Sequence, residues 1–206
     1  MARARTITDE QILDAALAVF MEDGAAATTA TIAERAGISE ASIFKRFGTK
    51  QALFCAALRP KGPPEWLQTM HSLAGRGTVA ENLRDLGTAL VGFFRAMMPR
   101  LMLLWSEQVP LDMWKVAGEK HPAVGVVRCV ADYVRAEITL GRLEDSDPLV
   151  TARIFVGAVA HFVFGEIAGF SETFDTDTDA YLDRLVALVA KPSIQEGRAD
   201  AVDPKA

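Results

Sequence analysis

The chain has 206 residues, half of them apolar, and its formal net charge is -5. This length and composition predict a folded globular protein of one domain or two small ones. The acidic balance excludes a protein that coats nucleic acid through bulk charge. If the chain reads DNA, it has to do so through a few placed cations, and its first fifty residues are close to neutral.

Two cysteines, Cys55 and Cys129, stand alone, without a CxxC partner or a histidine at ligand spacing. We therefore expect no disulfide framework, no metal site and no cofactor. The start, MARARTITDE, has no apolar signal core, and the longest nearly apolar run, 154–165, is well short of the roughly twenty residues that span a bilayer. These features predict a soluble cytoplasmic protein with no membrane partner.

Every segment has the periodicity of helices, and the alternation typical of strands is hard to find. Thr8 and Gln11 form a capping box before an apolar stripe that Gly24 closes. Hydroxyl or acidic side chains mark three further helix starts, at Thr28 or Thr29, at Ser39 or Glu40, and at Thr49. The first quarter of the chain is therefore expected to hold four helices.

The segment from Thr28 to Lys50 combines two short helices with a tight turn. Ala33 is small enough for two helices to cross closely, and Gly37 can adopt the left-handed backbone that ends the first of them. Ile43 is expected to point inward, while its polar and basic neighbours face out. This helix-turn-helix pattern is typical of a protein that places its second helix in the DNA major groove.

The Pro- and Gly-rich stretch 59–64 is the clearest break in the chain. We place a domain boundary there, with a helix-turn-helix DNA-binding domain at 1–58 and a helical effector-binding and dimerisation domain at 59–191. The polar, aperiodic residues 192–206 are expected to be a disordered tail.

The second domain is expected to be helical throughout. Its predicted helices cover 65–74, 78–98, 123–140, 148–170 and 178–190, while 110–121 is left unassigned. Pro99 is expected to interrupt or kink the apolar run that continues beyond it. The predicted fold class is all-α, a three-helix helix-turn-helix domain followed by a helical domain, with about nine helices in total.

Three blocks of sequence carry a resemblance to a known family. They are ITDEQILDAALAVF, TTATIAERAGIS and SIFKRFGTKQALF, and together they cover residues 7–54. Their order and spacing closely resemble the TetR (tetracycline-repressor) family of bacterial regulators. The resemblance implies a homodimeric transcriptional regulator, most often a repressor, that binds a double-stranded DNA operator. It also implies release from DNA when a small-molecule effector binds the helical domain.

The resemblance and the local chemistry together indicate the residues that meet DNA. Threonines at a helix N-terminus favour a phosphate, and Lys50 stands at the family's lysine position. Base edges are expected to meet Lys45 (guanine), Glu40 (cytosine) and Ala41 (the thymine methyl group). The full expected set is Thr28, Thr29, Ser39, Glu40, Ala41, Ser42, Phe44, Lys45, Arg46, Thr49 and Lys50.

Two positions depart from the family's pattern. Phe44 stands where the family usually has Tyr, so one hydroxyl-to-phosphate hydrogen bond is lost. Arg46 stands where the family often has His, which keeps a phosphate donor and makes its charge permanent. The alternative interpretation of Lys45, Arg46 and Lys50 is an ordinary solvated basic face.

The resemblance implies a dimer interface on the last two long helices. Gly157, His161, Gly165 and Gly169 form a row in a strongly apolar helix, and interior glycines favour close approach of another helix. The expected interface residues are Gly157, His161, Phe164, Gly165, Ala168, Tyr181, Leu182, Leu185, Val186 and Val189. Packing within one chain is the alternative, because periodicity does not say whose helix faces the row.

An effector pocket is expected where large, soft and aromatic side chains gather in the middle of the chain. Such side chains suit a small, largely apolar molecule, although ordinary core packing is the alternative for each. The candidates are Phe93, Phe94, Met97, Met98, Met102, Trp105, Met113, Trp114 and His161.

Other classes of protein are less consistent with the sequence. An enzyme is not expected, because no GxSxG, HExxH, phosphate-loop or dinucleotide motif occurs. A redox sensor is disfavoured because both cysteines lie in apolar helical patterns. The remaining alternatives are a helical interaction protein and a regulator without a small-molecule effector.

Overall fold

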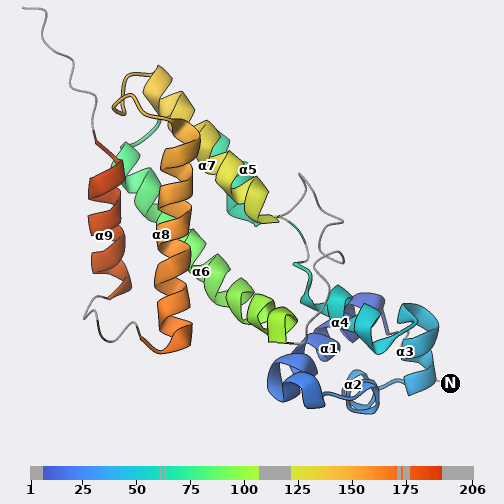
Figure 1. Ribbon diagram of the computed structural model, residues 1–206. Helices are drawn as coiled ribbons and strands as arrows, with labels where there is room; N and C mark the ends of the chain where they lie inside the picture. The colour runs from blue at the N-terminus through green and yellow to red at the C-terminus, as the bar shows by residue number, and fades with distance from the viewer. Residues whose placement is uncertain are drawn as a thin grey trace, which may run out of the picture. The chain divides into compact units, whose positions relative to one another are not determined.

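The computed structural model describes residues 7–60, 62, 64–106, 122–170, 173 and 177–191. The regular elements of these residues are all helical, which confirms the all-α class (Figure 1). The α-helices are α1 (Asp9–Asp23), α2 (Thr29–Ala36), α3 (Glu40–Phe47), α4 (Lys50–Leu58), α5 (Glu65–Met70), α6 (Val79–Ser106), α7 (Pro122–Thr139), α8 (Pro148–Ala168) and α9 (Thr178–Val189). The expected segment 110–121 lies outside the described residues.

The predicted helix starts are confirmed by their caps. Thr8 and Gln11 make the reciprocal capping box of α1, and Asp147 accepts two backbone N–H groups at the start of α8. Such side chains satisfy N–H groups that the helix leaves without an internal partner. The last helix starts at Thr178 as expected, and Asp177 caps it.

The expected interruption at Pro99 is wrong, because α6 runs unbroken from Val79 to Ser106. Proline removes one N–H group and crowds one carbonyl, but the bonds on either side can continue the helix. Leu101, Leu103 and Leu104, which follow Pro99, pack against the core formed by α1 to α4 and hold this part of α6 in place. Tertiary packing therefore overrides the local preference.

The chain divides into two compact units. The first contains Met1–Pro63 and Gly92–His121, and the second contains Pro64–Val91 and Pro122–Ala206. The first unit thus includes the second half of α6, which the expected boundary after residue 58 assigned to the other domain. The functional division at that boundary stays a prediction, and the expected tail at 192–206 lies outside the described residues.

The core of the first unit joins one apolar stripe from each of α1 to α4 with the end of α6. The rings of Phe20 and Phe54 meet edge to face with their centroids 4.8 Å apart. Ile32 and Ile43 are fully buried in the same cluster, and Leu104 reaches it from α6. Because each helix presents one apolar face, burying these faces together holds α3 with its opposite face in solvent.

In the second unit α8 lies between α7 and α9 (Figure 1). Tyr181 of α9 donates a hydrogen bond to the carbonyl of Ala158 at 2.9 Å and stacks on Phe162 with the ring centroids 4.4 Å apart. Burial raises the pKa of the Tyr181 hydroxyl. On α6, Gly87 leaves a notch that Leu182 of α9 fills, since a Cβ at Gly87 would lie 2.8 Å from Leu182 Cδ2.

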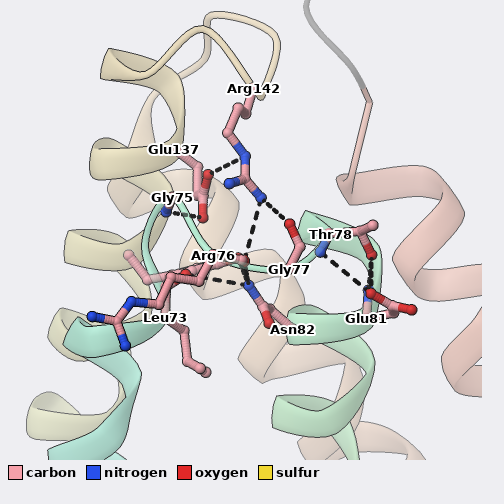
Figure 2. A network of polar contacts seen from close by, with 10 residues as sticks. Leu73, Gly75, Arg76, Gly77, Thr78, Glu81, Asn82, Glu137 and Arg142 are labelled. Carbon is pink, nitrogen blue, oxygen red and sulfur yellow. Dashed lines mark hydrogen bonds and ion pairs between the residues drawn. The ribbon is translucent and has the colours of Figure 1, made fainter.

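A buried polar network joins the end of α7 to the turn before α6 (Figure 2). The carboxylate of Glu137 is fully buried, accepts from the backbone N–H of Gly75 at 3.1 Å and lies 3.0 Å from Arg142 Nε. That second contact is an ion pair, because Glu137 Oε2 receives no well-directed hydrogen bond in the described part of the chain. Arg142 also donates to the Gly77 carbonyl at 2.7 Å. Closing this turn fixes where α6 begins.

Tyr133 belongs to the same network through Asn82. Ionisation of its hydroxyl is expected to lower the free energy of unfolding at alkaline pH. Burial raises its pKa from 10.0 to about 12, and Asn82 Nδ2 donates to its hydroxyl at 3.1 Å. A raised pKa means that the folded state holds the proton more tightly. The Tyr133 hydroxyl therefore contributes roughly 3 kcal/mol to the free energy of unfolding, for two pKa units. This contribution is complete below pH 10 and is lost as the pH rises towards 12.

Urea unfolding at several pH values between 8 and 12 checks this expectation, with Tyr133→Phe as the comparison. The phenylalanine variant has no hydroxyl to ionise, so its stability should fall less over the alkaline range. If the wild type and Tyr133→Phe lose equal amounts of stability between pH 8 and 12, Tyr133 does not cause the alkaline loss.

Among the residues that the structure describes, two helices are long and apolar enough to cross a membrane by length and composition alone. They are α6 and α8, with mean hydropathy 1.2 and 1.6 over their most apolar stretches. Core helices of soluble proteins have the same properties, so this is weak support for a membrane span. Only 33% of the α8 stretch is buried within the chain. Much of its apolar surface therefore faces outward.

Candidate nucleic-acid interface

The turn of the helix-turn-helix forms as the sequence predicts. Gly37 ends α2 in the left-handed conformation, with φ 68° and ψ 34°. Its N–H donates to the carbonyl of Glu34, and the N–H of Ile38 donates to the carbonyl of Ala33 at 3.0 Å. These bonds satisfy the last carbonyls of α2 and turn the chain sharply into α3.

Two buried side chains hold the helices of the motif together. Ala33 and Ile43 are both part of the hydrophobic core of the first unit, as predicted. Behind them, Arg35 of α2 forms two 2.7 Å hydrogen bonds with Glu22 of α1. The bond to Arg35 lowers the pKa of the Glu22 carboxyl and raises that of the guanidinium. The buried side chains and this ion pair therefore hold the helices in place, so that the outer face of α3 has a fixed position on the first unit.

The starts of α2, α3 and α4 are exposed, and each is capped by a hydroxyl. Thr28 accepts from the N–H of Thr31, Ser39 from that of Ser42, and Thr49 from that of Ala52, at 3.0–3.2 Å. The first N–H groups of each helix have no internal acceptor and point outward with the positive end of the helix dipole. These positions suit DNA phosphates.

The outward side of α3 carries the expected reading residues. Ala41, Phe44 and Lys45 are exposed, whereas Ser42 is half-buried and shares a 2.8 Å hydrogen bond with the Ser39 hydroxyl. Within the described ranges no hydrogen bond or ion pair engages Lys45. Its ammonium group is therefore free to meet a base or a phosphate.

Thr29 and Glu40 have a different arrangement from the one predicted. Thr29 is buried, and its hydroxyl donates to Glu40 Oε1. The threonine side chain thus braces α3 against α2 and is not available to a phosphate, which corrects that part of the prediction. The backbone N–H group of Thr29 remains a candidate donor to a DNA phosphate. Glu40 remains exposed but is held at its position by this bond.

Arg46 and Lys50 also have partners within the chain. Arg46 Nη1 donates to the Ile7 carbonyl at 2.8 Å and to Asp9 Oδ1 at 3.0 Å, which ties α3 to the start of α1. Lys50 Nζ lies 3.5 Å from the Ala25 carbonyl, at the limit of a hydrogen bond, and is exposed. A phosphate contact from Arg46 would therefore have to compete with Asp9.

Asp9→Asn is expected to raise DNA affinity by up to about tenfold. The ion pair is exposed, so its loss should cost less than about 1 kcal/mol in stability. The substitution removes a negative charge beside the phosphate-facing surface and frees Arg46 to bind a phosphate. Glu34→Gln, an exposed change of the same charge on α2, is the control in the same binding titration. If Asp9→Asn alone binds DNA more weakly, the Arg46–Asp9 ion pair supports DNA binding more than a free Arg46 does.

The expected pocket residues that the structure describes belong to two different units. Phe93, Phe94, Met98 and Met102 are half-buried and Met97 is buried on α6, while Trp105 is 64% exposed. His161 is exposed on α8 in the other unit, and Met113 and Trp114 lie outside the described residues. An open pocket of about 260 Å³, which the sequence did not indicate, is lined by α8 and α9 residues such as Thr151, Ile154 and Leu188.

The predicted dimer residues fall into two groups. Leu182, Leu185 and Val186 are buried within the chain, and Gly165 accommodates the ring of Phe170. For these residues packing within the chain is the correct reading, because a buried side chain has no surface left for a partner. Tyr181 and Val189 are half-buried, and the exposed members are Gly157, His161, Phe164 and Ala168. The partner face remains a prediction for these exposed residues.

Cysteine chemistry does not offer a second site. Cys55 and Cys129 are both buried, and burial raises the pKa of each thiol. A raised pKa leaves little of the reactive thiolate at neutral pH. Among the described residues no group of three His, Cys, Asp or Glu side chains could hold a metal ion.

The first unit therefore has the architecture of a helix-turn-helix DNA-binding domain. Residues 12–57 match the family model described as bacterial regulatory proteins, tetR family. An uncharacterized HTH-type transcriptional regulator, YvkB, of Bacillus subtilis (strain 168) is 37% identical over 93 residues. That match covers 41% of this chain and 43% of the relative, so less than half of the relative's length is spanned.

Solved structures share the fold at low identity. A TetR-family protein from Mesorhizobium loti is 18% identical with a TM-score of 0.67, covering 88% of this chain and 94% of that one. The regulator FadR from Bacillus subtilis, in complex with stearoyl-CoA, is 17% identical with a TM-score of 0.64, covering 89% and 98%. Residues 12–57 are thus similar in sequence to the DNA-binding segment of the TetR family of bacterial regulatory proteins, and the chain shares its fold with solved TetR-family regulators. These matches are to regulatory proteins, as the sequence led us to expect.

Proposed function

We propose that this protein is a homodimeric transcriptional regulator, acting as a repressor, that leaves a pseudo-palindromic operator when a small, largely apolar effector binds. The observation that carries the proposal is the exposed face of α3. That face has a free Lys45 and stands between the capped starts of α2 and α4. One helix reads a short half-site, so two copies are needed to place two such helices in successive major grooves about 34–36 Å apart.

Lys45→Ala is expected to weaken binding to the operator by about 10- to 100-fold, because one contact to a base edge or phosphate is lost. The measurement is a titration against DNA from upstream of the protein's own gene, at physiological salt and with excess unrelated DNA. Arg135→Ala is the matched control, since it removes one exposed positive charge on α7. Saturable binding protected over a pseudo-palindrome, and lost only in Lys45→Ala, supports the proposal.

Other results of that titration would count against it. Binding no tighter than to unrelated DNA would move the helical interaction protein ahead. Equal losses in Lys45→Ala and Arg135→Ala would mean that bulk charge, and not a placed contact, controls affinity.

The effector is proposed to be largely apolar because half-buried aromatic and methionine side chains gather on the second half of α6. The related FadR structure holds stearoyl-CoA, an acyl chain on a polar carrier. The test is operator affinity in the presence of long-chain acyl-CoA, free fatty acids and planar aromatic compounds. Affinity that none of them changes would favour the regulator without a small-molecule effector, which the exposure of Trp105 and His161 already makes the second candidate.

A further inference from the structure

Thr29 is a buried polar residue in the helix-turn-helix. Of the polar residues that the structure describes, three are buried, and Thr29 is the one in the first unit. Burying a hydroxyl without a hydrogen bond is costly. A threonine inside a helix can donate to the carbonyl one turn earlier, but Thr29 is the first residue of α2 and has no such turn before it. Its hydroxyl donates to Glu40 Oε1 on α3, eleven residues further along the chain.

This hydrogen bond fixes a carboxylate at the start of α3. Glu40 is the first residue of that helix and follows the cap Ser39. A bond to a charged acceptor is about twice as strong as one between neutral groups. In the described ranges Oε2 of Glu40 receives no hydrogen bond, and the residue is exposed. The bond from Thr29 therefore holds the side chain in one direction and leaves one oxygen free to accept.

A fixed carboxylate on a helix that meets DNA selects sequences by repulsion. Glu40 is the one acidic residue in the sequence of α3, whose other charged residues are Lys45 and Arg46. In the major groove a carboxylate opposes the acceptor atoms of guanine and thymine, and amino groups alone can donate to it. Discrimination of this kind needs a repulsive group that cannot turn away from the wrong base. The bond from Thr29 supplies that restraint.

Cytosine fits this acceptor better than adenine does. The edge of cytosine offers its N4 amino group, whereas the N6 amino group of adenine stands next to the acceptor N7. A carboxylate has no hydrogen to donate to N7, unlike the amide of glutamine. The N-terminal residues of a recognition helix are those that contact base edges, and Glu40 occupies the first position of α3.

We infer that Thr29 sets the sequence specificity of this protein through a side chain that does not touch DNA. Its hydroxyl fixes the Glu40 carboxylate, and Glu40 accepts from the N4 amino group of a cytosine in each half-site. Thr29 is therefore a positioning residue. The inference rests on the proposed sequence-specific binding of DNA, and it names one base pair that each half-site contains.

The test is sequence discrimination by the full-length protein. Selection from a random library of DNA duplexes supplies the preferred site, and titrations compare it with a duplex in which T·A replaces that C·G pair in one half-site. The wild type is expected to bind the altered duplex about 10- to 100-fold more weakly. Thr29→Val should reduce this ratio at least about fivefold, whereas Thr29→Ser keeps the hydroxyl and should preserve it within about twofold.

Further variants separate this role from a merely structural one. Thr31→Val is the matched control on α2, because the Thr31 hydroxyl bonds to Thr28 and not to α3, and the ratio should stay unchanged. Glu40→Gln should move the preferred pair from C·G to A·T. When Glu40→Ala is already present, adding Thr29→Val should change the ratio by less than about twofold, because the two residues act as a unit.

Failure of the inference and failure of the proposed function give different results. A library from which no sequence is enriched would overturn sequence-specific DNA binding itself. An enriched site that Thr29→Val discriminates as well as the wild type would overturn only the role of Thr29. Equal weakening on both duplexes, with a smaller salt dependence, would also overturn it, because the hydroxyl would then bind a phosphate. If Thr29→Val fails to fold, Thr29→Ala decides by the same ratio.

Discussion

Arg142→Ala is expected to lower the free energy of unfolding by about 2–4 kcal/mol, because it leaves a buried carboxylate without its cation. Arg142 Nε lies 3.0 Å from Glu137 Oε2, and the glutamate is fully buried while the arginine is 26% exposed. That exposure puts the expected loss below the value for a wholly buried pair. Urea unfolding at neutral pH measures it.

Two comparisons make this prediction specific. Arg135→Ala, on α7 two residues before Glu137, removes an exposed ion pair with Asp132 and should cost less than about 0.5 kcal/mol. Adding Glu137→Gln to Arg142→Ala should recover part of the loss, because a neutral amide costs less to bury than an unpaired charge. Equal stabilities of Arg142→Ala and Arg135→Ala would mean that Glu137 does not depend on its partner.

Leu182→Ala is expected to cost about 2–5 kcal/mol in unfolding free energy. The side chain is fully buried and fills the notch that Gly87 leaves on α6. Because glycine has no side chain to move inward, the space left by the truncation should not close. Flanking hydrogen bonds from Arg84 to Asp179 and Asp183 would keep α9 docked at the surface.

Leu188→Ala is the matched control on the same helix, since Leu188 is 70% exposed. Unfolding of the monomer, measured at low protein concentration, should change by less than about 0.5 kcal/mol. The proposed homodimer should nevertheless weaken, because Leu188 is exposed on α9, one of the two helices on which the sequence predicts the partner interface. If both leucine variants lower monomer stability equally, Leu188 is covered by its own chain and has no surface free for a partner.

On α9, Leu182 packs inside the chain's own core, whereas Leu188 is exposed and can contact a partner. Leu182 and Leu188 are chemically identical and lie less than two turns apart on one short helix. Their environments differ because α6 and α8 cover one side of α9 and leave the other side open. A dimer partner would therefore meet the second side without disturbing the packing of the first.

Local features of the first unit could be predicted from the sequence. The capping box at Thr8, the turn at Gly37 and the buried positions of Ala33 and Ile43 all depend on contacts within a few residues or on a strong helical periodicity. The exposed position of Lys45 follows from the same periodicity. The residues that determine a helix start or a helix face lie within a few positions of one another, so a single sequence is enough to predict them.

Side-chain partners across elements could not be predicted in this way. Thr29 donates to Glu40 eleven residues away, and Arg46 reaches the backbone at Ile7 across thirty-nine. Both residues have the chemistry for DNA, and nothing local distinguishes a free side chain from a bonded one. The signal missed for Glu137 was an acid one turn after Tyr133, on the same face of α7 as the apolar residues Val126 and Val130.

The sequence by itself determined the helical fold class, the helix-turn-helix and the exposed side of α3 that we propose for DNA, because periodicity, caps and the glycine turn act over a few residues. Only the tertiary structure decided which candidates are already bonded within the chain, that α6 continues through Pro99, and that Leu182 belongs to the core while Gly157 lies open. Those outcomes depend on which faces meet after the chain has folded, and that pairing is a long-range property.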